Sequence, residues 1–206
     1  MIIPARIPVL IQRFFKERIW KIETNQRELF LTFDDGPHPR ITSAVLDILK
    51  KHDAKATFFC IGDRVKRFPE IYKRILDEGH AVGNHTMHHI NGWKSGLDEY
   101  CNDVEQAAKY IKSNMFRPPY GRMNRKQFDY VASKGMKTVM WTVLSGDYDY
   151  RLSPEKVYER VIRDMQQGNI YLFHDSEKAE VNMVFVLEKF IEYAKRHDYS
   201  FSSIKF

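Results

Sequence analysis

Two adjacent carboxylates, Asp34 and Asp35, are the first residues of this sequence that indicate chemistry. They stand in "LTFDDGPHP", where a short apolar run meets the pair. Neighbouring side chains of an extended segment point to opposite sides, so the two carboxylates can do different work. One can bind a divalent metal ion, while the other acts as a general base beside the bound water. A polar turn is the structural alternative, because Asp, Gly and Pro all favour turns.

Histidines form the second candidate cluster, in the stretch "GNHTMHH". A spacing of four residues predicts that His85 and His89 lie on one side of a helical turn, about 5–6 Å apart at Cβ. Two imidazoles and a carboxylate from another segment make the ligand set of hydrolytic zinc sites and of iron oxygenases. His88, at a spacing of three, is a competing ligand. A cluster of structural histidines is the alternative without a metal.

Two further stretches place polar residues at the ends of apolar runs. In "FRPPYGR", Arg117 can pair with a carboxylate and keep it ionised. The two prolines leave the backbone N–H of Tyr120 as the next free donor, which can stabilise an oxyanion. In "LFHD", His174 can donate a proton to a leaving amine, and Asp147 is a candidate to orient it. The structural alternatives are a turn with a salt bridge and a buried histidine.

Short apolar runs that alternate with helical patterns must position these residues. Strands are expected at 28–33, 55–61, 80–85, 115–119, 137–143, 169–174 and 199–204, and helices near 41–52, 67–78, 97–113, 125–134, 154–167 and 182–197. We expect Thr42 or Ser43 to cap the first helix and Ser153 the fifth. The alternation predicts parallel βαβ units in an open or barrel-like α/β fold. Because sites in such folds gather where strands end, the polar residues should converge on one face.

The composition is that of an ordinary globular protein. A length of 206 residues suits one domain with a substantial core. The formal net charge of +6 is modest, basic residues are interspersed with acidic ones, and no nucleic-acid-binding signature is found. Cys60 and Cys101 form neither a disulfide framework nor a four-thiolate metal site. Whether these two cysteines pair is open.

The N-terminal stretch "MIIPARIPVLIQRFF" is apolar but is interrupted by prolines and arginines. It lacks the basic start and the small-residue cleavage site of a signal peptide, and no window approaches the ~20 apolar residues of a membrane span. We expect residues 1–27 to form a segment docked on a catalytic domain of residues 28–206, with a cytoplasmic location by default. The sequence does not indicate the oligomeric state.

Five motifs follow one another along the chain: "TFDDGP" at 32–37, "HTMHH" at 85–89, "RPPYG" at 117–121, "WTVLSGDY" at 141–148 and "LFHD" at 172–175. With these motifs the chain resembles the polysaccharide deacetylase family, which includes chitin, chitooligosaccharide and peptidoglycan deacetylases. The resemblance spans about residues 28–204. It implies a single-domain α/β fold, a distorted seven-stranded (β/α) barrel, and a divalent metal, usually Zn²⁺, with Co²⁺ or Ni²⁺ as other candidates.

The resemblance also implies roles for individual residues. The expected metal ligands are Asp35, His85 and His89, with His88 as a non-ligand. The expected catalytic residues are Asp34 as general base, Arg117 holding it, His174 as general acid and Asp147 oriented toward it. The expected substrate and oxyanion residues are Tyr120 through its backbone N–H, Tyr148 and Leu172 around the acetyl methyl, and Trp141.

The implied reaction is hydrolysis of an N-acetyl group on an amino-sugar polymer or oligosaccharide, with release of acetate. The alternatives are removal of an O-acetyl group from a sugar, cleavage of another small N-acyl substrate, and an inactive carbohydrate-binding module. Asp147-Tyr148 stands where many members have Asp-Trp, and Leu144 stands where an acid is frequent. These departures bear on the substrate more than on the reaction class. Many relatives act outside the cytoplasm. His38 has no assigned role.

Overall fold

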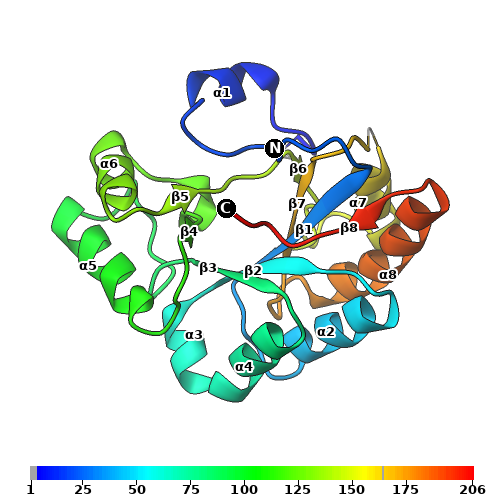
Figure 1. The fold of residues 1–206 in the computed structure, drawn as a ribbon, viewed down its shortest axis with the longest axis horizontal. Helices are drawn as coiled ribbons and strands as arrows, with labels where there is room; N and C mark the ends of the chain where they lie inside the picture. Colours follow the sequence, from blue (N-terminus) through cyan, green and yellow to red (C-terminus); the bar gives the residue numbers. More distant parts are fainter. Residues whose placement is uncertain (1–3, 164) are drawn as a thin grey trace.

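The computed structural model describes residues 4–163 and 165–206. Within this part, seven strands follow the order β5-β4-β3-β2-β1-β7-β6, and every pairing along this path is parallel. The strands are β1 (Glu28–Asp34), β2 (Ala56–Cys60), β3 (Ala81–Asn84), β4 (Met115–Phe116), β5 (Lys137–Thr138), β6 (Val143–Leu144) and β7 (Ile170–His174). A short β8 (Ser200–Phe201) pairs with the start of β1. The sheet curls into an incomplete barrel (Figure 1), which confirms the predicted distorted seven-stranded α/β fold.

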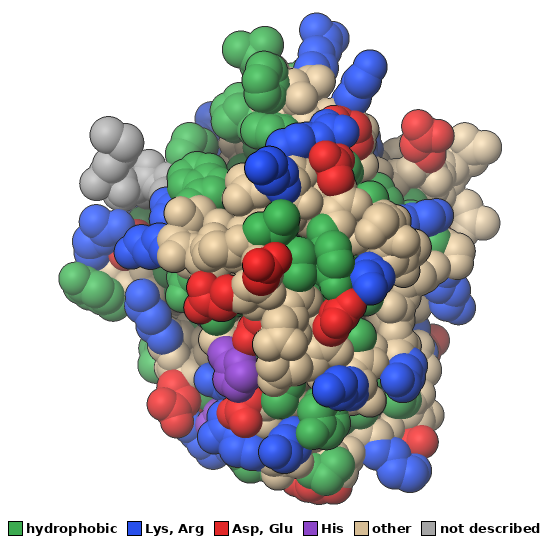
Figure 2. All heavy atoms as spheres, turned by 90° about the vertical axis from the view of Figure 1, so that its left-hand side faces the viewer, with side chains coloured by type: hydrophobic (Ala, Val, Ile, Leu, Met, Phe, Trp, Pro, Cys, Tyr) green, Lys and Arg blue, Asp and Glu red, His purple; other side chains and the backbone are tan. Residues whose placement is uncertain are grey.

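Helices surround the curled sheet in Figure 1. They are α1 (Val9–Phe14), α2 (Ile41–Lys51), α3 (Gly62–Arg67), α4 (Pro69–Asp77), α5 (Leu97–Ala108), α6 (Arg125–Ser133), α7 (Pro154–Ile162) and α8 (Glu180–Arg196), with a 3₁₀ turn at Pro119–Gly121. Among these described helices, α1 stands apart from the outer ring and buries none of its residues. At the top of Figure 2, where α1 lies, hydrophobic side chains gather beside lysines and arginines. No helix in the described ranges is both long enough and apolar enough to cross a bilayer.

The central strand β1 is buried on both faces. Leu31 and Phe33 belong to a cluster that includes residues of α2 and α8, while Phe30 on the opposite face packs in a second cluster with Phe59. A strand covered on both faces has a nearly continuous apolar sequence, as "ELFLTF" does. This burial fixes β1 between β2 and β7, so the carboxylate at its end is held by a rigid strand.

The prediction of one strand over 137–143 is wrong, because this stretch divides into β5 and β6 on opposite edges of the sheet. The carbonyls of Val139 and Met140 accept hydrogen bonds from the Arg117 side chain at 3.0 and 2.8 Å. These carbonyls are therefore not available for a continuous ladder. The chain leaves the edge strand β5, which pairs with β4, and crosses to the opposite edge strand β6, which pairs with β7.

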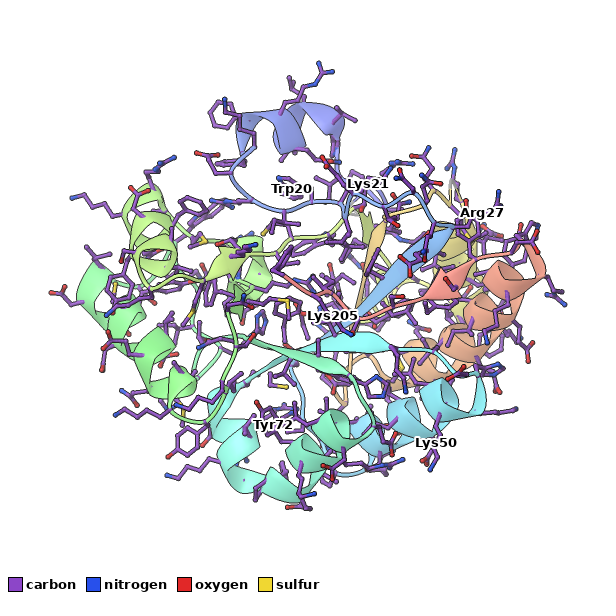
Figure 3. All side chains as sticks on the ribbon, viewed as in Figure 1. Trp20, Lys21, Arg27, Lys50, Tyr72 and Lys205 are labelled. Carbon is purple, nitrogen blue, oxygen red and sulfur yellow. The ribbon has the colours of Figure 1, made fainter. Side chains whose placement is uncertain are left out.

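The N-terminal segment pairs with the crossing stretch. The backbone N–H of Ile19 donates to the carbonyl of Thr138, and that of Met140 donates to the carbonyl of Ile19. The backbone N–H of Ile7 donates to the carbonyl of Thr142. Trp20, which lies beneath α1 in Figure 3, is 8% exposed and donates its indole N–H to the carbonyl of Phe15. Residues 1–3 of the predicted segment lie outside the described residues. The division at residue 27 stays a prediction.

The helix expected at 67–78 is α4, at Pro69–Asp77, and α3 was not predicted. The two helices are separated at Phe68, because the residue before Pro69 is disfavoured in the helical region. The predicted cap of α2 is wrong. Helix α2 begins at Ile41 and has no side-chain cap from Thr42 or Ser43. Instead, Nδ1 of His38 accepts hydrogen bonds from the backbone N–H groups of Arg40 and Ile41. His38, which had no role in the sequence, thus satisfies two free donors at the start of α2.

The other helices lie close to their predicted positions. Helix α5 ends at Ala108 and α7 at Ile162, both earlier than expected, and residue 164 of the predicted range is outside the described residues. The cap at Ser153 is confirmed, since its hydroxyl accepts from Lys156 N–H. Cys60 and Cys101 are both buried free thiols, so they do not pair with each other.

Candidate active site

The structure brings the predicted site residues to the carboxyl ends of the parallel strands. Asp34 ends β1 and is level with His174, which ends the neighbouring β7. His85 directly follows β3, and Arg117 directly follows β4. Because these strands are parallel, residues separated by up to 140 positions in sequence meet at one end of the barrel.

Asp35, His85 and His89 form a group whose candidate ligand atoms all lie within 4.8 Å of one another. Asp35 Oδ1 is 3.2 Å from His89 Nε2 and 3.9 Å from His85 Nε2. The carbonyl of Arg117 lies 2.7 Å from His85 Nδ1 and accepts a hydrogen bond from it, which leaves the lone pair of His85 Nε2 toward the group. Burial lowers the pKa of His85 to about 4, so its imidazole is neutral at pH 7. A neutral imidazole is the form that binds a metal.

The segment from His85 to His89 is an irregular turn, so the predicted helical turn is wrong. Thr86 and His89 have φ values of 66° and 57°, in the left-handed region. The buried carboxylate of Asp103 accepts hydrogen bonds from Met87 N–H at 2.8 Å and His88 N–H at 3.0 Å. Its other oxygen lies 2.6 Å from His88 Nδ1, which turns His88 away from the group. Asp103 was missed in the sequence, where it is one acid among several in α5.

Asp34 is held by a buried arginine. Its Oδ1 accepts a hydrogen bond from Arg117 Nη1 at 2.7 Å, and the same nitrogen donates to Thr32 Oγ1 at 2.7 Å. Arg117 is completely buried, and its guanidinium lies 4.0 Å from the centre of the Phe59 ring. Asp34 Oδ2 points toward the histidine group, 3.7 Å from His85 Nε2. One oxygen of Asp34 is therefore fixed, and the other faces the group that could hold a metal.

The turn after Asp35 is fixed by Asp175, the last residue of the "LFHD" motif, for which no role was predicted. Gly36 N–H donates to Asp175 Oδ1 at 2.8 Å, and the Thr42 hydroxyl donates to Oδ2. A Cβ atom at position 36 would lie 2.0 Å from Asp175 Oδ2, so only glycine fits there. Burial raises the pKa of Asp175 to about 7. Burial acts to raise the pKa of Asp35 as well, but the close contact with His89 and the charges of His174 and His89 outweigh it and lower this pKa well below its ordinary value.

His174 and Asp147 form a close pair. His174 Nδ1 lies 2.8 Å from Asp147 Oδ1, and His174 N–H donates to Asp147 Oδ2 at 2.7 Å. Burial lowers the pKa of His174, but the charge and hydrogen bond of Asp147 outweigh burial and raise it to about 9. The imidazole of His174 is therefore protonated at neutral pH. Its ring packs edge-on against Tyr148, with 5.0 Å between ring centres.

Two of the remaining predicted residues contact side chains of the site. Tyr120 has a φ of 60° and is 60% exposed, and its ring lies 4.7 Å from that of His89. Trp141 lies 5.7 Å from the Arg117 guanidinium, and it leaves no room for a Cβ at Gly121. Leu172, on β7, is buried. Aromatic side chains thus contact His89, Arg117 and His174 individually.

Comparison with known sequences identifies relatives over most of the chain. The polysaccharide deacetylase family model matches residues 21–139. A peptidoglycan-N-acetylglucosamine deacetylase of Bacillus cereus is 34% identical over 191 residues, which cover 90% of each protein. A chitooligosaccharide deacetylase of Azorhizobium caulinodans is 35% identical over 164 residues, covering 75% of this chain and 77% of that protein.

Solved structures of similar proteins have the same fold as this chain. The crystal structure of a peptidoglycan N-acetylglucosamine deacetylase superimposes with a TM-score of 0.88 at 30% identity, covering 96% of this chain and 95% of the other. A pseudoenzyme of the CE4 family from Bacillus anthracis gives a TM-score of 0.80 at 28% identity, covering 91% of this chain and 67% of the other. The fold is thus shared by active and inactive relatives. The sequence match, its coverage and the barrel agree: this chain belongs to the polysaccharide deacetylase family.

Proposed function

We propose that this protein is a metal-dependent hydrolase that removes N-acetyl groups from an amino-sugar polymer or oligosaccharide of the chitin or peptidoglycan type, with release of acetate. The observation that carries the proposal is the meeting of three groups at one end of the barrel. They are the ligand group of Asp35, His85 and His89, the carboxylate of Asp34, and the protonated His174. Because a pseudoenzyme shares this fold, activity must be argued from these side chains.

The donor set fits a divalent metal such as Zn²⁺. Two imidazole nitrogens and one carboxylate oxygen, with further positions open for water and substrate, are characteristic of hydrolytic zinc sites. His85 is neutral and presents Nε2, and Asp35 is ionised, so both are in the state that binds a metal. When bound, such an ion would lower the pKa of a bound water and polarise the acetyl carbonyl.

The side chains would move protons on either side of the scissile amide. Asp34 Oδ2 would accept a proton from the attacking water, while Arg117 keeps Asp34 Oδ1 fixed. The backbone N–H of Tyr120 would donate to the developing oxyanion. His174 would donate its proton to the leaving amine nitrogen, because Asp147 keeps the imidazole charged and oriented. An amine leaves only when it is protonated, so this acid is needed for amide cleavage.

Acetate release is the direct test. Protein stripped of metal, and then supplied with Zn²⁺, Co²⁺ or Ni²⁺, would be assayed on chitooligosaccharides, peptidoglycan and acetylated xylan. We expect acetate from the N-acetylated substrates only after metal is restored. Release from xylan alone would make the protein an O-acetyl esterase, and release from none of them would refute the proposal.

The variant Asp34→Asn tests the assigned base. We expect kcat to fall by about 10²–10⁴-fold, because the amide cannot accept the proton, while bound metal is retained. The matched control is Asp77→Asn on the surface of α4, which removes a similar charge paired only with exposed Lys73. Full activity of Asp34→Asn with normal metal content would show that another group is the base.

A further inference from the structure

Trp93 is a large aromatic side chain that the fold leaves open, with 67% of its surface exposed. Single exposed apolar residues are common on soluble proteins, so exposure alone indicates little. Two additional observations distinguish Trp93. Its loop is held by a buried side chain, and contacts through Arg122 and Tyr120 connect it to the candidate active site.

The loop that carries Trp93 is held by a buried side chain of α6. Gln127 is fully buried and donates its Nε2 to the carbonyls of Gly92 at 2.9 Å and Ser95 at 3.3 Å. Trp93 N–H donates to Asn91 Oδ1 at 3.0 Å. A Cβ at Gly92 would lie 2.6 Å from the carbonyl of Arg122, so the two loops are in close contact. An exposed aromatic ring on a fixed loop is preorganised for binding, because little freedom is lost when a ligand covers it.

Side-chain contacts link Trp93 to the histidine group. Trp93 is four positions after His89, so the chain allows a distance of at most about 14 Å between their Cα atoms. The Arg122 guanidinium lies 4.9 Å from the centre of the Trp93 ring, and Arg122 is two residues after Tyr120, whose ring contacts His89. Figure 1 shows α5, which follows the Trp93 loop, next to α6, which follows Arg122. Trp93, Arg122 and Tyr120 therefore form one surface that ends at His89.

We infer that Trp93 stacks on a sugar ring next to the one whose acetyl group is removed, and that this contact strengthens the binding of an oligosaccharide relative to a monosaccharide. This inference rests on the proposed function. The face of an indole is apolar and carries a negative quadrupole, which attracts the C–H groups on the face of a pyranose ring. Arg122 covers one side of the ring, and its N–H groups can donate to sugar hydroxyls. Since 67% of the Trp93 surface is exposed, a sugar can still reach the side chain.

Acrylamide quenching of tryptophan fluorescence gives a test that does not depend on catalysis. Trp20 is 8% exposed and Trp141 is half-buried, so Trp93 is the most accessible of the three tryptophans to acrylamide. The probes are N-acetylglucosamine and its β-1,4-linked tetramer, added to the Zn²⁺-loaded Asp34→Asn protein. We expect the tetramer to protect Trp93 from quenching and the monosaccharide to protect it much less. No protection by the tetramer would overturn the inference.

The matching kinetic test compares kcat/KM for the tetramer with kcat/KM for the monosaccharide. We expect Trp93→Ala to lower the ratio of the two about tenfold, and Trp93→Phe to restore most of it. The control is Tyr110→Ala, an exposed aromatic residue just beyond α5, which should leave the ratio unchanged. An equal loss on both substrates in Trp93→Ala would also overturn the inference.

The quenching experiment separates this inference from the proposed function. If the protein releases no acetate from any substrate but the tetramer still protects Trp93, the proposed activity is wrong and the sugar-binding role of Trp93 stands. If acetate is released without protection, and the ratio of kcat/KM values is unchanged in Trp93→Ala, the activity stands and the role of Trp93 falls.

Discussion

Replacing Arg117 with lysine tests how Asp34, the proposed base, is held. Arg117 makes four side-chain hydrogen bonds, all buried, to Thr32, Asp34, Val139 and Met140. Lysine keeps the positive charge beside Asp34 but replaces a planar fork with a single nitrogen. A nitrogen placed beside Asp34 cannot also reach the carbonyls of Val139 and Met140, which lie on the other edges of the guanidinium.

The expected cost follows from those two carbonyls. Each buried acceptor that loses its partner costs about 1–2 kcal/mol, so Arg117→Lys should lower the free energy of unfolding by about 2–4 kcal/mol. With an m-value of about 2–3 kcal/mol per molar urea, the unfolding midpoint should fall by about 1–2 M. The value of kcat should also fall, by about 100-fold, because Asp34 is no longer fixed in position.

Urea unfolding, followed by circular dichroism, measures the first effect, and acetate release measures the second. The matched control is Arg125→Lys at the surface of α6, where the arginine pairs with exposed Glu17 and Asp129. This control should change the unfolding free energy by less than about 0.5 kcal/mol. A midpoint for Arg117→Lys equal to that of the wild type would refute the reasoning, because the two carbonyls would then have other donors.

Three further predictions concern the residues around the site. Asp103→Ala should weaken Zn²⁺ binding about 10–100-fold, because the turn before His89 loses its anchor; competition with a chelator measures this, and unchanged affinity would contradict it. Asp175→Ala should lower the unfolding free energy in urea by about 1–3 kcal/mol, because the buried N–H of Gly36 loses its acceptor, and Asp175→Asn should cost less. The kcat should fall as pH rises through about 9, where His174 loses its proton. Asp147→Asn should move this fall to lower pH, because the charge that raises the pKa of His174 is removed. A fall at the same pH in both proteins would exclude His174 as the acid.

The placing of the site could be predicted because its residues come directly after apolar strands. A strand such as β1 is recognisable from its own residues, and parallel strands end together, so Asp34 and His174 had to lie close once the fold class was known. The ligand group follows the same logic, since His85 comes directly after β3. What was predicted therefore depends on features that are local in sequence or common to the fold class.

The supporting residues could not be predicted, because they act on the backbone of distant segments. Asp103 looks like an ordinary helix acid until the N–H groups of Met87 and His88 are seen to point at it. The division of 137–143 into two strands has the same origin. Its apolar pattern suits one strand. The strand is interrupted because Arg117, about 20 positions earlier, donates hydrogen bonds to the carbonyls of Val139 and Met140.

The position of β1 between β2 and β7 also means that β1 cannot complete its pairing until β7 is present. The hydroxyl of Thr32 donates to the carbonyl of Tyr171, 139 positions away, and pairings of such long range close slowly. A growing chain on the ribosome that lacks β7 leaves one edge of β1 unpaired, which is an aggregation hazard. Such a chain already contains Asp34, Asp35, His85 and His89, but it lacks His174, the proposed proton donor. The candidate site is therefore completed only once β7 has been synthesised.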